Sequence, residues 1–300
     1  MFGFEEWALK PEDLDISKTE FLIDDFLVKE SITLVYGAPS QGKTWFMYAL
    51  SKYLAANALC KKLFYIDMDN GKRQLSDREV AEKLLVLPSL TYISKSKIPK
   101  TAVELLYDIN KEAYGENYKD IVFVFDSTRD FVDNTKNDVQ AKRFMEIMKN
   151  IREAGGTVLL IHHATKSGKV IDGSGEFAKS ADNVYELKQR LKTGTSLHYF
   201  LKVENDRDPI KNAYFSVDTK TYELTRGDEA FGDMTKDEEA FVRKVLDLLL
   251  NSPGGLNQSK ILAALGKSRD DKKGRGLIEK FRGRFWEVEY VGKQKIYKAM

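Results

Sequence analysis

The stretch LVYGAPSQGKTW (34–45) contains a complete G-x-x-x-x-G-K-S/T pattern. Gly37 and Gly42 can adopt backbone angles closed to other residues, so the loop between them can turn its N–H groups toward phosphate oxygens. Lys43 can bring a positive charge to the β- and γ-phosphates, and Thr44 can offer its hydroxyl to Mg²⁺. These residue types in this order predict a site for ATP and Mg²⁺. The predicted nucleotide-binding residues of this stretch are Gly37, Ala38, Pro39, Ser40, Gln41, Gly42, Lys43, Thr44 and Trp45.

Asp126 ends the apolar run IVFVFDS (121–127), which would deliver its carboxylate to the carboxyl edge of a buried strand. In P-loop enzymes an Asp at this place holds the magnesium shell, although such a residue can also cap the next segment. Thr44 and Asp126 are therefore the predicted metal-binding residues. Ser127 follows where many ATPases have a water-activating Glu, so we expect the catalytic carboxylate elsewhere. Trp45 has two possible roles, packing on the sheet or lying near the nucleotide base.

These residues can form one site only in a fold that brings the ends of several strands together. The sequence from Ser31 to Val217 predicts such a fold. Runs rich in β-branched and aromatic residues fit strands buried on both faces, at 31–37, 61–69, 90–94, 121–127 and 156–163. Apolar residues at helical spacing lie between them, at 45–59, 72–85, 101–114 and 139–155. Such alternation predicts an α/β fold with a mostly parallel sheet flanked by helices. Shorter, more polar segments at 183–190, 196–204, 212–218 and 221–226 predict antiparallel hairpins at one sheet edge.

The C-terminal part of the chain has a different pattern. Helical patterns at 241–255, 256–268 and 271–284 precede a hairpin pattern at 285–300, which together predict a small winged-helix domain. From Thr235 onward there are 15 Lys and Arg against 9 Asp and Glu, so this part is basic and a candidate for nucleic-acid contacts. Contacts with another protein, or a merely solubilising surface, are the alternatives. The predicted DNA-contacting residues here are Lys272, Lys273 and Arg275. The predicted domains are an N-terminal segment (1–20), the α/β domain (21–225), a linker (226–235) and the winged helix (236–300).

The bulk composition fits a soluble, cytoplasmic protein. The chain has 300 residues, 42% of them hydrophobic, and a formal net charge of only +2. A single cysteine, Cys60, excludes an intramolecular disulfide and fits a reducing compartment. The N-terminus lacks the basic and apolar regions of a signal peptide, and no apolar run is long enough to span a membrane.

The order of these motifs resembles the RepA-type hexameric replicative helicases and related RecA-like ATPases of plasmids and phages. The resemblance implies a RecA-like P-loop NTPase core. In that family a Y-L-x-x-E-D pattern presents the catalytic Glu, and an Arg near the nucleotide follows nine residues later. Here FYIDMDN (64–70) puts Asp69 at the Glu position, and Arg78 is nine residues on. Asp is one methylene shorter than Glu, so hydrolysis by Asp69 could be slow, and Asp67 is the alternative.

The stretch LLIHHATKSG (159–168) resembles the family segment in which a His-His pair ends a strand at the γ-phosphate sensor position. Strand alternation sends His162 and His163 to opposite faces, so we expect only one to face the phosphates. A metal site is less well supported, because no cysteine or carboxylate cluster accompanies the pair. The resemblance implies that Lys166 and Lys169, in the loop that follows, grip single-stranded DNA in a central channel.

The resemblance also implies a homo-oligomeric, hexameric ring in which a neighbouring subunit completes each site with a cation. Lys202 and Arg207, in FLKVENDRDP (200–209), are the candidates, and the pattern does not rank them. The implied function is a motor that hydrolyses ATP to move along or unwind DNA of a mobile element. Two other functions fit the same motifs. One is a DNA-binding ATPase that mediates recombination or partition without unwinding, and the other is an ATP-binding switch whose winged helix reads duplex DNA.

Overall fold

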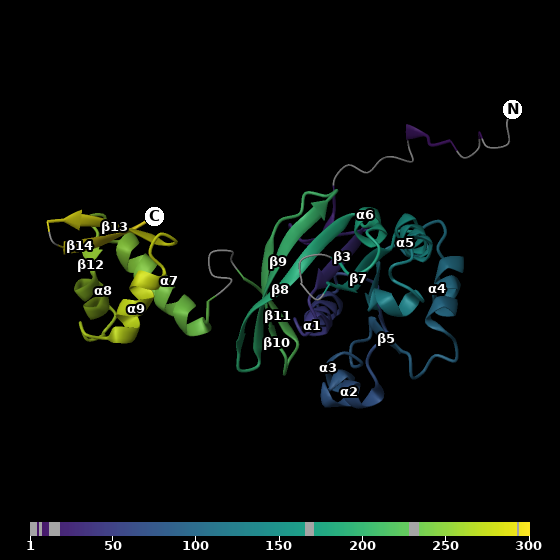
Figure 1. Cartoon of the computed structure of the whole chain (residues 1–300), viewed down its shortest axis with the longest axis horizontal. Coiled ribbons are helices and arrows are strands. Elements are labelled where there is room, and N and C mark those ends of the chain that lie inside the picture. Colours follow the sequence, from purple (N-terminus) through teal and green to yellow (C-terminus); the bar gives the residue numbers. More distant parts are fainter. Residues whose placement is uncertain (1–4, 6–7, 12–18, 166–170, 228–233, 293) are drawn as a thin grey trace. The chain divides into compact units, whose positions relative to one another are not determined.

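The apolar runs form one nine-stranded sheet in the computed structural model, which describes residues 5, 8–11, 19–165, 171–227, 234–292 and 294–300 (Figure 1). The strand order is β11-β10-β9-β8-β3-β7-β6-β4-β5. Neighbours from β8 to β5 pair in parallel, whereas β8–β9 and β9–β10 pair antiparallel. The predicted α/β fold with antiparallel edge strands is therefore confirmed. The strands are β3 (Ile32–Gly37), β4 (Lys62–Asp67), β5 (Leu90–Ser94), β6 (Ile121–Asp126), β7 (Thr157–His163), β8 (Asn183–Thr193), β9 (Ser196–Asp206), β10 (Ala213–Asp218) and β11 (Glu223–Gly227).

Helices cover both faces of the sheet, because the central strands are apolar on both faces. On β3, Val35 packs into the core layer beneath α1, and its neighbour Leu34 packs into the opposite layer, which α4 and α5 cover. Phe46 of α1 and Phe144 of α5 are buried in these two layers. The helices of this unit are α1 (Lys43–Ala56), α2 (Lys72–Asp77), α3 (Val80–Lys83), α4 (Ala102–Lys111), a 3-10 helix (Thr128–Phe131), α5 (Asp138–Glu153) and α6 (Glu176–Ser180). A short hairpin of β1 (Phe21–Ile23) and β2 (Leu27–Val28) precedes the sheet.

The pattern at 72–85 predicts one helix, but the structure has two short helices there, α2 and α3. Glu79 between them has a left-handed backbone, with φ 56°, which an uninterrupted helix excludes. The Tyr222 hydroxyl donates a hydrogen bond to the carbonyl of Arg78 at 2.6 Å, so a residue distant in sequence stabilises the break. Arg78, next to the break, lines the pocket at the end of the sheet described below.

The chain divides into two compact units, Met1–Arg226 and Gly227–Met300. The second unit has its own core, in which Trp286 and Phe281 are buried and the Trp286 indole N–H donates to the carbonyl of Ile278 at 2.9 Å. Its elements are α7 (Lys236–Leu250), β12 (Leu256–Asn257), α8 (Gln258–Ala264), α9 (Lys272–Lys280), β13 (Trp286–Val291) and β14 (Gln294–Ala299). The three strands pair in the order β12-β14-β13. None of the helices in the described part of the chain has both the length and the apolar character needed to cross a membrane.

Candidate active site

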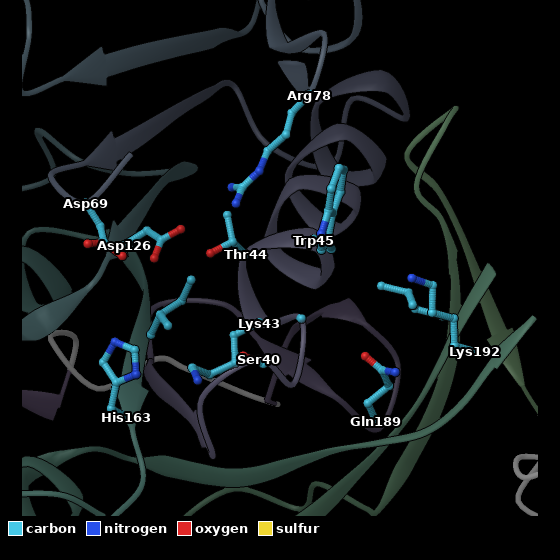
Figure 2. A pocket seen from close by; sticks show the side chains of 13 residues that line it. Ser40, Lys43, Thr44, Trp45, Asp69, Arg78, Asp126, His163, Gln189 and Lys192 are labelled. Atoms are coloured by element: carbon cyan, nitrogen blue, oxygen red, sulfur yellow. The ribbon is translucent and has the colours of Figure 1, made fainter. Parts of the chain in front are cut away.

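A pocket of about 490 Å³ lies at the carboxyl ends of β3, β4, β6 and β7 (Figure 2). Parallel strands end at a common edge, so residues from distant parts of the sequence meet there. The antiparallel strands β8 and β9 contribute the remaining wall. The lining residues are Ser40, Gly42, Lys43, Thr44, Trp45, Asp69, Arg78, Asp126, Ile161, His163, Gln189, Lys192 and Leu197.

The phosphate loop joins β3 to α1, and both of its glycines are required by the structure. Gly42 has φ 72°, and a Cβ at this position would lie 2.4 Å from the Tyr199 hydroxyl oxygen. A Cβ at Gly37 would lie 2.7 Å from the carbonyl oxygen of Leu187. The Tyr199 hydroxyl donates to the Gly42 carbonyl at 3.0 Å, and the Gln41 side chain accepts from the backbone N–H of Gln189 at 2.8 Å. Strands β8 and β9 therefore hold the loop in shape. Four of the predicted nucleotide-binding residues of the loop are not among those that line the pocket, namely Gly37, Ala38, Pro39 and Gln41.

Lys43 points back into its own loop. Its ammonium group donates to the carbonyls of Gly37 and Ala38, each at 2.9 Å. The side chain is buried, and burial lowers the pKa of Lys43 from 10.5 to about 8, an effect that Asp126 partly opposes. The lysine is thus held where phosphate oxygens could take the place of the two carbonyls.

Asp126 and Thr44 form an oxygen-donor pair at the same end of the sheet. Asp126 is buried, accepts a hydrogen bond from the Tyr65 hydroxyl at 2.8 Å and is also hydrogen-bonded to Thr44. Burial, together with the neighbouring charge of Asp67, raises the pKa of Asp126 to about 7. A carboxylate and a hydroxyl are hard oxygen ligands, and a divalent cation would relieve the buried negative charge. These two residues therefore fit Mg²⁺.

The two acids after β4 have different environments. Asp67 is fully buried and accepts hydrogen bonds from the backbone N–H groups of Asp69 and Asn70 and from the Tyr92 hydroxyl at 2.5 Å. With its oxygens engaged in this way, Asp67 is not available to orient water, which rules against the alternative to Asp69. Asp69 lines the pocket with its side chain 44% exposed, and it forms an ion pair with Arg129 at 3.3 Å.

The structure separates the two histidines, His162 and His163, which were the catalytic candidates at the predicted γ-phosphate sensor position and of which only one was expected to face the phosphates. His163 lines the pocket, and its Nε2 atom is buried without a hydrogen-bond partner. Burial and the nearby charges of Lys43 and Arg129 lower the pKa of His163 to about 4, so its imidazole is neutral. His162 faces the opposite side, where its Nδ1 bonds to Thr128 and its Nε2 to the carbonyl of Asp172. The placement agrees with the alternation of side chains along the strand, and it leaves His163 as the candidate at the pocket, because His162 joins two loops away from it.

Trp45 and Arg78 share one wall of the pocket (Figure 2). The Arg78 guanidinium carbon lies 5.3 Å from the centroid of the Trp45 ring, and Arg78 also donates to the Asn70 side chain at 3.0 Å. Trp45 packs against the core layer beneath α1 and meets Tyr222 edge to face. Trp45 therefore packs on the core, as one of its two predicted roles requires, and it also lines the pocket, while its contact with a nucleotide base stays a prediction. Lys192 lies on the β8 side of the pocket.

Other predicted residues lie outside this pocket. Lys202 forms an ion pair with Glu204 at 2.7 Å, and Arg207 forms one with Asp182 at 3.3 Å. Asp182 also accepts a hydrogen bond from the backbone N–H of Ile32, at the beginning of β3. Arg207 therefore lies at the amino end of β3, whereas the pocket lies at its carboxyl end. The other predicted residues are Lys166 and Lys169, which fall outside the described residues, and Lys272, Lys273 and Arg275, which belong to α9 of the second unit.

Several residues at the site were not predicted. Tyr65 contacts Asp126, and Arg129 pairs with Asp69. Tyr199 and Gln189 bond β9 and β8 to the phosphate loop, and Lys192 of β8 lines the pocket. Of these residues, only Tyr65 could have been predicted from the sequence, because it is two residues before Asp67 and its side chain therefore lies on the same face of the strand. The others depend on sheet order, which no local pattern specifies.

A family model described as an AAA domain matches residues 13–169, just over half of the 300 residues. Two solved structures have a similar fold. One, described as an ATPase domain, is 12% identical with a TM-score of 0.52, and the match covers 75% of this chain and 96% of that one. The other, the KaiC-like protein PH0186 from the hyperthermophilic archaeon Pyrococcus horikoshii OT3, is 13% identical with a TM-score of 0.50, covering 70% and 100%. No curated protein sequence matches the chain. At these identities the similarities show the fold alone, which is that of a RecA-like P-loop ATPase.

Proposed function

Because the chain belongs to the AAA domain family, we propose that it is an ATP-driven motor acting on DNA, as a ring-forming helicase of the replicative type. The observation that carries this proposal is the meeting of Lys43, Thr44, Asp126, Asp69 and His163 around one pocket on a RecA-like fold. Phosphate binding, metal binding and water orientation each have a chemically suitable side chain there.

In this proposal Lys43 and the backbone of the phosphate loop bind the ATP phosphates, while Thr44 and Asp126 hold Mg²⁺. The bound ion would offset charge on the β- and γ-phosphates. Asp69 orients the attacking water, which requires release from Arg129, its partner in this structure. His163 is neutral and partnerless at Nε2, so it can donate a hydrogen bond to the γ-phosphate.

A ring would place a cation from one subunit at the site of the next. A cation that completes the site of a neighbouring subunit lies outside the pocket of its own chain. Lys202 and Arg207 both do so, and both remain candidates for this cation. The proposal assigns Lys166 and Lys169 to contacts with single-stranded DNA in the channel of the ring, in keeping with the sequence prediction.

The element order of the second unit, α7-β12-α8-α9-β13-β14, supports the winged-helix assignment. Lys272, Lys273 and Arg275 belong to α9, the third helix of the unit, and all three are exposed on it. With the basic charge of this part of the chain, their exposure supports duplex DNA as the partner of α9.

The test is ATP turnover measured without DNA, with single-stranded DNA and with duplex DNA, alongside Lys43→Ala as a catalytically dead control. The motor proposal expects strong stimulation by single strands, displacement of a strand from a forked duplex, and a ring-sized particle by mass measurement with ATP. Stimulation without strand displacement would reject the helicase and leave a DNA-dependent ATPase.

A second candidate function is an ATP-binding switch that scarcely hydrolyses its ligand. The Asp69–Arg129 ion pair favours it, because a short carboxylate already held by a cation is a poor base. This candidate expects tight ATP binding, negligible phosphate release with any DNA, and preference for a particular duplex sequence.

A further inference from the structure

Two buried carboxylates lie side by side at the pocket end of the sheet, and one of them, Asp126, lines the pocket. Asp67 and Asp126 are directly paired residues of β4 and β6, and they are 0% and 2% exposed. Buried carboxylates require hydrogen-bond donors, and the arrangement of the donors fixes which way each oxygen points. Here the donors are divided between the two acids. Tyr65 donates to Asp126, whereas Tyr92 and Tyr48 donate to Asp67.

Tyr65 is itself held firmly. Its side chain is fully buried, its ring stacks on Tyr92 with centroids 5.0 Å apart and an interplanar angle of 5°, and it also packs against Tyr48 at 5.2 Å. With both neighbours in contact, the ring has little rotational freedom. Its hydroxyl is therefore fixed at 2.8 Å from Oδ2 of Asp126.

We propose that Tyr65 is a positioning residue for metal binding, since its hydroxyl holds Oδ2 of Asp126 and leaves the other carboxylate oxygen for the metal shell beside Thr44. Tyr65 is not among the residues that line the pocket, so it would act only through Asp126. The inference rests on the proposed function only in so far as the pocket binds a magnesium nucleotide, and it requires neither DNA nor unwinding.

A purely structural role for Tyr65 predicts a different result. The matched control is Tyr92, which belongs to the same cluster of Tyr48, Tyr65 and Tyr92. Tyr92→Phe also removes one hydroxyl from the cluster, but that hydroxyl serves Asp67 and not Asp126. If the tyrosines only pack α1 against the sheet, the two variants should affect nucleotide binding alike. If Tyr65 positions Asp126, only Tyr65→Phe should change the contribution of the metal.

The experiment measures the affinity of full-length protein for a fluorescent, non-hydrolysable ATP analogue, once with excess Mg²⁺ and once with EDTA. The ratio of the two affinities is the coupling between metal and nucleotide. A hydrogen bond to a charged group is strong enough for its loss to change binding by about tenfold. We therefore expect Tyr65→Phe to reduce the ratio about tenfold with unchanged affinity in EDTA, and Tyr92→Phe to keep the wild-type ratio.

A double-mutant cycle completes the test. Asp126→Asn removes the ligand that Tyr65 serves, so adding Tyr65→Phe to it should leave the ratio unchanged. The proposal is overturned if Tyr65→Phe keeps the wild-type ratio, if Tyr92→Phe loses as much, or if the double variant loses more than Asp126→Asn alone. Failure of wild-type protein to bind the analogue would instead reject the proposed function.

Discussion

The lowered pKa of Lys43 makes nucleotide affinity depend on pH, in a direction that the structure determines. The buried ammonium group has only two backbone carbonyls as hydrogen-bond partners, and burial brings its pKa from 10.5 to about 8. Phosphates that replace these carbonyls favour the charged form and raise the pKa again. Above pH 8 the free protein has lost this proton, so binding must take one up and affinity must fall.

The magnitude follows from the fraction of charged lysine. About nine in ten molecules carry the charge at pH 7 and about one in ten at pH 9, so the dissociation constant should rise about tenfold between these values. Lys43 is a base whose pKa is lowered by folding, so its burial costs stability below pH 8. That cost disappears as the pH rises from 8 toward 10.5, so stability without ligand should increase while affinity decreases.

Equilibrium binding of a fluorescent ADP analogue from pH 7 to pH 9.5, in EDTA, measures this effect without a metal contribution at Asp126. Lys43→Arg is the control, because guanidinium stays charged throughout this range. The reasoning is refuted if wild-type affinity is constant from pH 7 to pH 9, or if Lys43→Arg shows the same decline.

Three further predictions concern Asp69, the phosphate loop and α9. Asp69→Asn should lower kcat by about a hundredfold with little change in KM, whereas Asp69→Glu should retain activity, and steady-state ATP hydrolysis distinguishes them. Gly42→Ala combines left-handed strain with a clash at the Tyr199 hydroxyl, so it should cost roughly 2–4 kcal/mol of unfolding free energy in chemical denaturation. Adding Tyr199→Phe should recover part of that loss, and no recovery would contradict the clash. In α9, Gly276→Ala meets no atom within 4 Å and should stabilise the second unit by roughly 0.5–1 kcal/mol, whereas Gly274→Ala clashes with a side chain of α8 and should destabilise it.

Sequence reasoning brought residues to one place where their position depends on local order. The phosphate loop and Asp126 each follow a run of apolar residues, and a parallel sheet brings such strand ends to one edge whatever its exact strand order. Asp69 reaches the same pocket for this reason. These residues could be named before the fold was known.

Sequence reasoning was insufficient where tertiary contacts determine the position of a side chain or the end of a helix. Period-two alternation shows that His162 and His163 diverge, but only the packing of β7 shows that His163 faces the pocket. The helical pattern at 72–85 contains no residue that predicts its interruption. The hydrogen bond that stabilises the break comes from the Tyr222 hydroxyl, which is distant in sequence. Lys192 could not have been assigned either, since β8 reaches the pocket only through its place beside β3.

Trp45 gives this protein a natural optical reporter. The chain has three tryptophans, and the structure describes Trp45 and Trp286, one in each unit. Trp45 lines the nucleotide pocket beneath the Arg78 guanidinium, so its emission should change when a ligand displaces that cation. Trp286 is fully buried in the second unit and should respond only when that unit unfolds. With Trp7 replaced by Phe, intrinsic fluorescence can follow ligand occupancy and unfolding of the second unit in one unlabelled sample.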